Sequence, residues 1–92
     1  MQGKRTRIEI INDMLRTINS KGGRIKPTHL MYKANLSHNQ MQQYLDELIA
    51  KNLILEETQG KEERKMLAIT DTGISFINKY NQMKEFEKTF GL

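Results

Sequence analysis

The stretch THLMYKANLSHNQMQQYLDELIAKN, residues 28–52, decides the fold of this chain. Its apolar residues recur at spacings of three and four, which predicts a short helix over about 27–34 and a longer helix ending near Lys51. The segment Asn35-Leu36-Ser37 separates them, because Asn tolerates a positive φ and Ser37 with Gln40 can cap the second helix. We therefore expect two helices joined by a tight turn, with Leu36 pointing inward.

The sequence on either side completes a small domain. Thr6 with Glu9 predicts a capping box, and a single apolar stripe follows it to Gly22-Gly23, formed by Ile8, Ile11, Leu15 and Ile18. Residues 24–26 fit a brief edge strand or a linker. Residues 53–58 and 66–70 predict two strands, and the polar segment 59–63 predicts the turn between them.

Helix, turn, helix and hairpin in this order are typical of a winged helix-turn-helix, which commonly presents one helix to a DNA groove. We predict an α+β, mainly α, fold. Residues 1–70 would form the winged helix-turn-helix with a basic N-terminal arm, and residues 71–92 a dimerisation helix of the same domain.

The last predicted helix carries two different faces. Gly73 in its first turn would allow close backbone approach, and Ile74 and Ile77 are expected to lie against the body of the domain. A second apolar stripe continues to the end of the helix, where a small domain has little left to cover it: Phe76, Tyr80, Met83, Phe86 and Phe90. This stripe predicts an antiparallel coiled coil with a second copy, the alternative being packing within one chain.

Composition indicates a folded protein of one domain with a basic end. The 92 residues include 37% hydrophobic and 28% charged residues, no cysteine, and a formal net charge of +4. Residues 1–33 hold eight basic residues against two acidic ones, whereas residues 34–60 hold one against four. A basic segment of this kind favours a polyanionic partner, although it is also compatible with ordinary solubility.

Candidate DNA contacts come from the predicted reading helix, the turn before it, the hairpin and the arm. Amides of the helix can bond adenine, and its N-terminus favours a phosphate. The helix has no basic residue before Lys51, and Asp46 and Glu47 oppose DNA, so only its first half is expected to enter a groove. The candidates are Lys4, Arg5, Arg7, Tyr32, Lys33, Ser37, His38, Asn39, Gln42, Gln43, Lys61, Arg64 and Lys65. The alternatives are a solvated amide face, a solubilising hairpin tip and a frayed terminus.

Other classes of function find little support. The two histidines, His29 and His38, have no cysteine and no carboxylate at ligand spacing, so no metal or other cofactor is expected. No acid, base or nucleophile pattern predicts an enzyme or a small-molecule substrate. The first residues, MQGKRTRIEI, lack the apolar segment of a signal peptide, and no apolar run is long enough for a membrane, so we expect a cytoplasmic protein.

Three motifs resemble those of the small archaeal winged-helix DNA-binding proteins and predicted transcriptional regulators. They are Leu-x-Tyr-Lys-Ala-Asn-Leu-Ser at Leu30–Ser37, Tyr-Leu-x-x-Leu at Tyr44–Leu48, and Leu-x-Ile-Thr-x-x-Gly at Leu67–Gly73. The resemblance implies a homodimer joined by the last helices. Together, these observations predict a homodimeric regulator or nucleoid-associated factor that binds double-stranded DNA. The competing interpretation is a winged helix that serves as a protein-interaction module without DNA binding.

Overall fold

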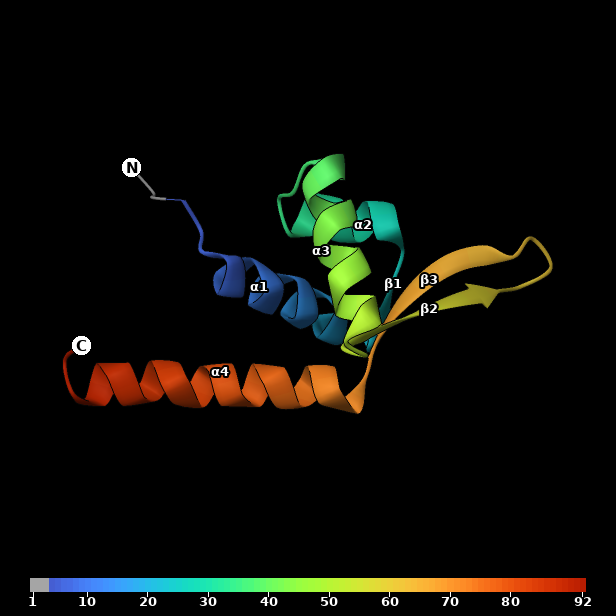
Figure 1. Ribbon diagram of the computed structural model, residues 1–92. Helices are drawn as coiled ribbons and strands as arrows, with labels where there is room; N and C mark the ends of the chain where they lie inside the picture. Colours follow the sequence, from blue (N-terminus) through green and yellow to red (C-terminus); the bar gives the residue numbers. More distant parts are fainter. Residues whose placement is uncertain (1–3) are drawn as a thin grey trace.

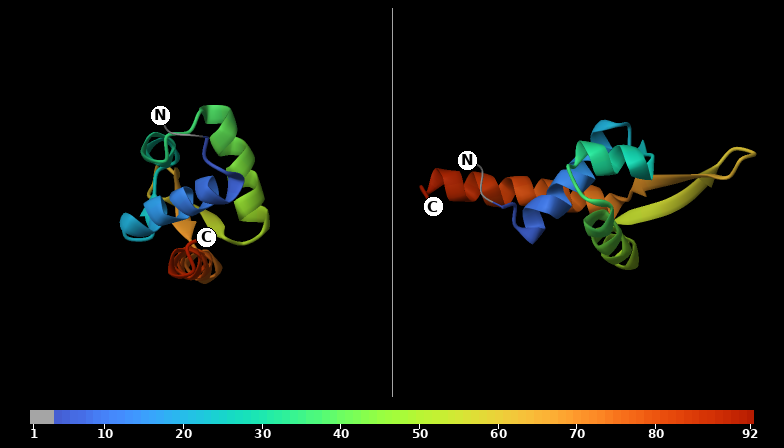
Figure 2. Two further views of the ribbon diagram at one scale, coloured as in Figure 1. Left: turned by 90° about the vertical axis from the view of Figure 1, so that its left-hand side faces the viewer. Right: turned by 90° about the horizontal axis from the view of Figure 1, so that it is seen from above.

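The structure is a computed structural model that describes residues 4–92. Four helices and a three-stranded sheet follow one another along the chain (Figure 1): α1 Arg7–Ser20, β1 Arg24–Ile25, α2 Pro27–Lys33, α3 His38–Ala50, β2 Ile54–Gln59, β3 Arg64–Ile69 and α4 Asp71–Thr89. Residues 4–92 measure about 52 × 30 × 22 Å along their principal axes. The β2–β3 hairpin and the C-terminal half of α4 extend in opposite directions from the core (Figure 2).

The sheet is antiparallel and has the order β1-β3-β2. Ile25 pairs with Leu67, and Glu57 pairs with Met66 on the other side of β3. The short segment before Pro27 is therefore an edge strand, which fixes α2 beside the base of the hairpin.

The caps that begin the helices lie where the sequence predicts them. Thr6 and Glu9 form one capping box, and Ser37 and Gln40 form the other. Asn35 has a φ of 56° and ends α2, and Leu36 behind it is buried. Because these interactions are local, the α2–α3 turn can be predicted from the sequence alone.

The core lies between α1, α2, α3 and the sheet. Its fully buried side chains come from each of these elements: Met14, Leu15, Ile18, Leu30, Leu48, Ile54 and Leu67. Helix α1 is buried on a wider face than predicted, because Ile10 and Met14 also enter the core. Asn12 is buried beside them at 3% exposure, and its Oδ1 has no hydrogen-bond partner within residues 4–92.

Two apolar predictions are wrong. Ile8 is 43% exposed, although it was assigned to the apolar stripe of the first helix, and Ile74 is 38% exposed, although it was expected to lie against the body of the domain. The reason lies in where α4 crosses the body. Gly73 and Ile77 make the close contact, which turns Ile74 toward solvent, and Ile8 lies at the edge of the α1–α4 contact rather than within it.

Candidate nucleic-acid interface

Helix α3 presents an amide-rich surface next to the hairpin. Met41, Leu45 and Leu48 hold its inner side in the core, which leaves the opposite side to solvent. The exposed residues are Ser37, His38, Asn39, Gln40, Gln42, Gln43 and Asp46. Gln42 donates a hydrogen bond from Nε2 to Oδ1 of Asp46 at 2.9 Å, so one amide is already oriented by the helix itself.

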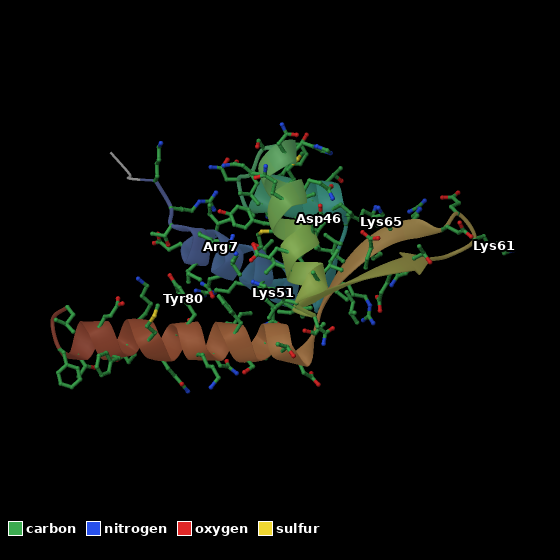
Figure 3. The ribbon with its side chains drawn as sticks, viewed as in Figure 1. Arg7, Asp46, Lys51, Lys61, Lys65 and Tyr80 are labelled. Atoms are coloured by element: carbon green, nitrogen blue, oxygen red, sulfur yellow. The ribbon has the colours of Figure 1, made fainter. Side chains whose placement is uncertain are left out.

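The second acidic residue of α3 is compensated by neighbouring cations. Glu47 accepts hydrogen bonds from Lys51 Nζ, at 2.9 Å, and from the Arg7 guanidinium. These hydrogen bonds, the one from Lys51 first, hold the pKa of Glu47 below its ordinary value. Glu47 therefore contributes little net repulsion toward DNA, whereas Asp46 points to the side of α3 that faces the hairpin (Figure 3).

The start of α2 and the first part of β3 bring together cations from distant parts of the sequence. A cavity of about 310 Å³ lies between the start of α2 and β3, and it is lined by Lys26, Pro27, Thr28, Arg64 and Lys65. Arg64 pairs with Glu62 at 3.0 Å and Lys65 with Glu56 at 3.6 Å, both at the surface. Within residues 4–92, Lys26 and Lys61 have no ion pair, and Lys61 lies at the tip of the hairpin (Figure 3).

Lys26 and Thr28 were missed by the sequence reasoning. They precede the apolar pattern of α2 and have no basic neighbours in sequence beyond Arg24. The pairing of β1 with β3 places them next to Arg64 and Lys65. The sequence did hold one signal, the prediction of an edge strand at residues 24–26. Pairing that strand with its neighbour in the sheet would have placed both residues beside the hairpin.

The basic arm folds back onto the domain. Arg5 pairs with Asp13 and donates a hydrogen bond to the carbonyl oxygen of Asn35, both at 2.9 Å. Arg7 pairs with Glu47, and its guanidinium lies 5.9 Å from the centre of the Tyr44 ring. Lys4 is exposed. Two of the three arm cations thus have partners within the protein, a point that local sequence does not indicate.

Tyr32 and Lys33 lie apart from the hairpin. Tyr32 is 78% exposed on the outer surface of α2. Lys33, at the end of α2, lines a second polar cavity together with Arg5 and Arg16 of the α1 region. Among the candidate contacts, Arg5 and Lys33 thus lie at the end of α2, whereas Arg64 and Lys65 lie beside its start.

The aromatic stripe of α4 is only partly covered. Phe76 and Tyr80 are half-buried and stacked with ring centres 6.4 Å apart, whereas Phe86 and Phe90 are exposed with ring centres 4.9 Å apart. An apolar groove of about 210 Å³ runs along the first part of the stripe, lined by Ile8, Phe76, Lys79, Tyr80 and Met83. Ile8 is thus an additional member of this apolar surface.

Residues 4–92 offer neither a cluster of metal ligands nor a membrane-spanning helix. Among residues 4–92, no cluster of three His, Cys, Asp or Glu side chains is placed to hold a metal ion. None of the helices in that part of the chain combines the length and the apolarity needed to cross a bilayer.

The element order, the capped helices α1 and α3 and the β2–β3 hairpin after α3 define a winged helix-turn-helix protein. The sequence matches the family described as winged helix-turn-helix over residues 4–88. The chain belongs to this family. No match appears among proteins with curated functions.

Solved structures share the fold over most of the chain. Sso10a-2, a DNA-binding protein from Sulfolobus solfataricus, is 23% identical with a TM-score of 0.78, covering 94% of this chain and 85% of that one. F93 from STIV, a winged-helix DNA-binding protein, is 21% identical with a TM-score of 0.73, covering 94% and 95%. The PcaV transcriptional regulator from Streptomyces coelicolor is 12% identical with a TM-score of 0.75, covering 88% and 60%. At these identities the similarity establishes the fold.

Proposed function

We propose that this protein binds double-stranded DNA as a homodimer and acts as a transcriptional regulator or a nucleoid-associated factor rather than as an enzyme. The observation that carries the proposal is the presence of two surfaces that suit DNA. Exposed amides occupy the first half of α3, and the cations Lys26, Arg64 and Lys65 line the cavity between the start of α2 and β3.

The amides of α3 suit the base edges of a duplex, and the lysines suit its phosphates. Asn39 and Gln43 carry both a donor and an acceptor, which match the edge of adenine in the major groove. Lys26 and Lys61 supply positive charge for phosphates, where affinity gains from counterion release. The family and the DNA-binding proteins of the same fold support this reading.

The homodimer rests on the apolar surface of α4. Met83, Phe86 and Phe90 are 43%, 59% and 64% exposed, a row of large apolar side chains that a lone chain leaves in water. An antiparallel copy of the same helix offers each chain an identical apolar stripe. The dimer also doubles the DNA contacts, which compensates for a reading helix with few charges.

A salt titration tests the DNA proposal. Fluorescence anisotropy with a mixed-sequence duplex should show binding whose affinity falls steeply as salt rises. The double variant Lys26→Gln/Lys65→Gln should bind more weakly and with a shallower salt dependence, whereas Lys88→Gln, at the far end of α4, should match the wild type. The absence of binding to any duplex, or binding independent of salt, would contradict the proposal and favour a protein-interaction module.

A further inference from the structure

A second polar cavity lies on the side of α2 away from the hairpin. It has a volume of about 350 Å³ and opens between α1 and the end of α2. Its lining includes three cations, Arg5, Arg16 and Lys33, and a single carboxylate, that of Asp13. The cavity is therefore polar and basic, whereas the groove beside α4 is apolar.

The charges of this cavity do not cancel. Arg5 and Asp13 pair at 2.9 Å and compensate each other. Within residues 4–92, neither Arg16 nor Lys33 has a carboxylate within ion-pair distance, and both are exposed. About two positive charges remain at the cavity, from side chains on two different helices.

Part of the lining is held in place before any ligand arrives. The Arg5 guanidinium is fixed between Asp13 and the carbonyl oxygen of Asn35. The Thr17 hydroxyl donates to the carbonyl oxygen of Asp13 at 2.6 Å, so it is not free to donate elsewhere. The charged donors left for a ligand are those of Arg16 and Lys33 and the remaining N–H groups of Arg5. Because the one carboxylate, that of Asp13, is already paired with Arg5, the remaining charge suits an oxyanion and not a cation.

The position of the cavity relates it to the reading helix. Lys33 and Asn35 end α2 and precede the Ser37 cap of α3, whereas Lys26 and Thr28 lie at the start of α2, in the cavity shared with β3. Helix α2 has seven residues and is therefore about 10 Å long. The major groove of DNA is roughly 12 Å wide. One basic cavity at each end of α2 thus matches the two phosphate backbones that border one groove.

We propose that the cavity between α1 and α2 binds a backbone phosphate of DNA through Arg16 and Lys33, on the strand opposite to the one held by Lys26 and Lys65 at the start of α2. This inference rests on the proposed function and adds a second phosphate site to it. It also assigns a role to Arg16, which belongs to α1 and not to the hairpin or to α3.

The test compares salt dependence across matched variants. Arg16→Gln and Lys33→Gln should each lower the slope of log affinity against log salt by about one, and each should weaken binding roughly tenfold at about 0.1 M salt. Lys88→Gln serves as the control for loss of one positive charge. Thermal unfolding of each variant should match the wild type, because both side chains are exposed.

The outcomes separate this inference from the proposed function. If the wild type binds DNA but Arg16→Gln and Lys33→Gln behave like Lys88→Gln, the second phosphate site is wrong and the DNA proposal stands. If the wild type binds no duplex, both proposals fail. A titration of the DNA-free protein with inorganic phosphate, followed by amide NMR shifts, distinguishes the source of the anion. Saturable shifts around Arg16 and Lys33 with unchanged salt slopes would assign the cavity to a free phosphate compound and overturn the proposal.

Discussion

Helices α3 and α4 differ in how the core of the domain contacts them. The core contacts α3 along its length, through Met41, Leu45 and Leu48, and its exposed side is polar. It contacts α4 chiefly near its start, through Gly73 and Ile77, and the exposed side farther along is apolar. A polar exposed side is stable in water alone, whereas an apolar one gains free energy only when something covers it. In the proposed function, this difference assigns α3 to a solvated polyanion and α4 to another apolar surface.

The apolar end of α4 gives the largest expected effect. Met83→Glu together with Phe86→Glu would place two charges on each side of the proposed dimer contact, and we expect dimerisation to weaken by roughly a hundredfold or more. Unfolding of the monomer should change little, because both side chains are already exposed. Sedimentation velocity over a concentration series measures the first quantity, and chemical unfolding at high dilution the second.

The matched control for that pair is Asn81→Glu, which adds a charge on the polar side of the same helix. It should leave the dimer intact. A wild-type protein that stays monomeric at high concentration would rule out the dimer and would leave the comparison of the two helices without its explanation.

The anchored start of α4 gives the next effect. A Cβ at Gly73 would lie 2.5 Å from the carbonyl oxygen of Leu53 and 2.7 Å from Cγ1 of Ile69, so the helix must move. Overpacking costs about 3 kcal/mol, and the better helix propensity of alanine returns about 1 kcal/mol. We therefore expect Gly73→Ala to lower the free energy of unfolding by about 2 kcal/mol in urea denaturation. Ser75→Ala, exposed in the same part of the helix, should be close to neutral, and an equal loss there would contradict the steric explanation.

The smallest effect concerns α3 and its contact with α1. The hydrogen bonds from Lys51 and Arg7 lower the folded-state pKa of Glu47, so their stabilisation is present above the unfolded pKa, near about 4.3. It is lost as pH falls through the lower folded-state pKa. Glu47→Gln should therefore flatten the decline of stability below about pH 5, measured as the midpoint of thermal unfolding. Glu85→Gln on α4 should not, and an identical flattening in that variant would show that the ion pairs with Glu47 play no part.

The parts of the fold that follow from sequence are those decided within a few residues. Thr6 with Glu9, Ser37 with Gln40, and Asn35 each satisfy a helix end locally, and all three lie where the sequence predicts them. Gly73 likewise makes the predicted close approach. What the sequence did not yield depends on distant partners. Ile8 and Ile74 fit an inward apolar pattern, but α4 contacts the body through Gly73 and Ile77, which leaves Ile74 exposed and Ile8 at the edge of the α1–α4 contact.

The candidate site likewise has parts that local sequence predicts and parts that depend on distant residues. The exposed amides of α3 follow from helix periodicity, which places Asn39 and Gln43 opposite the buried Met41 and Leu45. The two basic cavities cannot be predicted from periodicity, because each combines residues from two elements that meet only in the folded chain. Arg5 and Arg7 look like a free arm in the sequence, yet Asp13 and Glu47, eight and forty residues away, bind their guanidinium groups.

The Thr70 hydroxyl has a consequence for the assembled protein. It caps α4 by accepting from the Gly73 N–H and donates at 2.7 Å to the carbonyl oxygen of Asn52, just after α3. The direction of α4 is thereby fixed relative to α3. In the proposed dimer, the distance between the two reading helices is then set by the number of residues between Gly73 and the dimer contact, at about 1.5 Å per residue. The spacing of half-sites on DNA becomes a property of α4, a helix that itself touches no base.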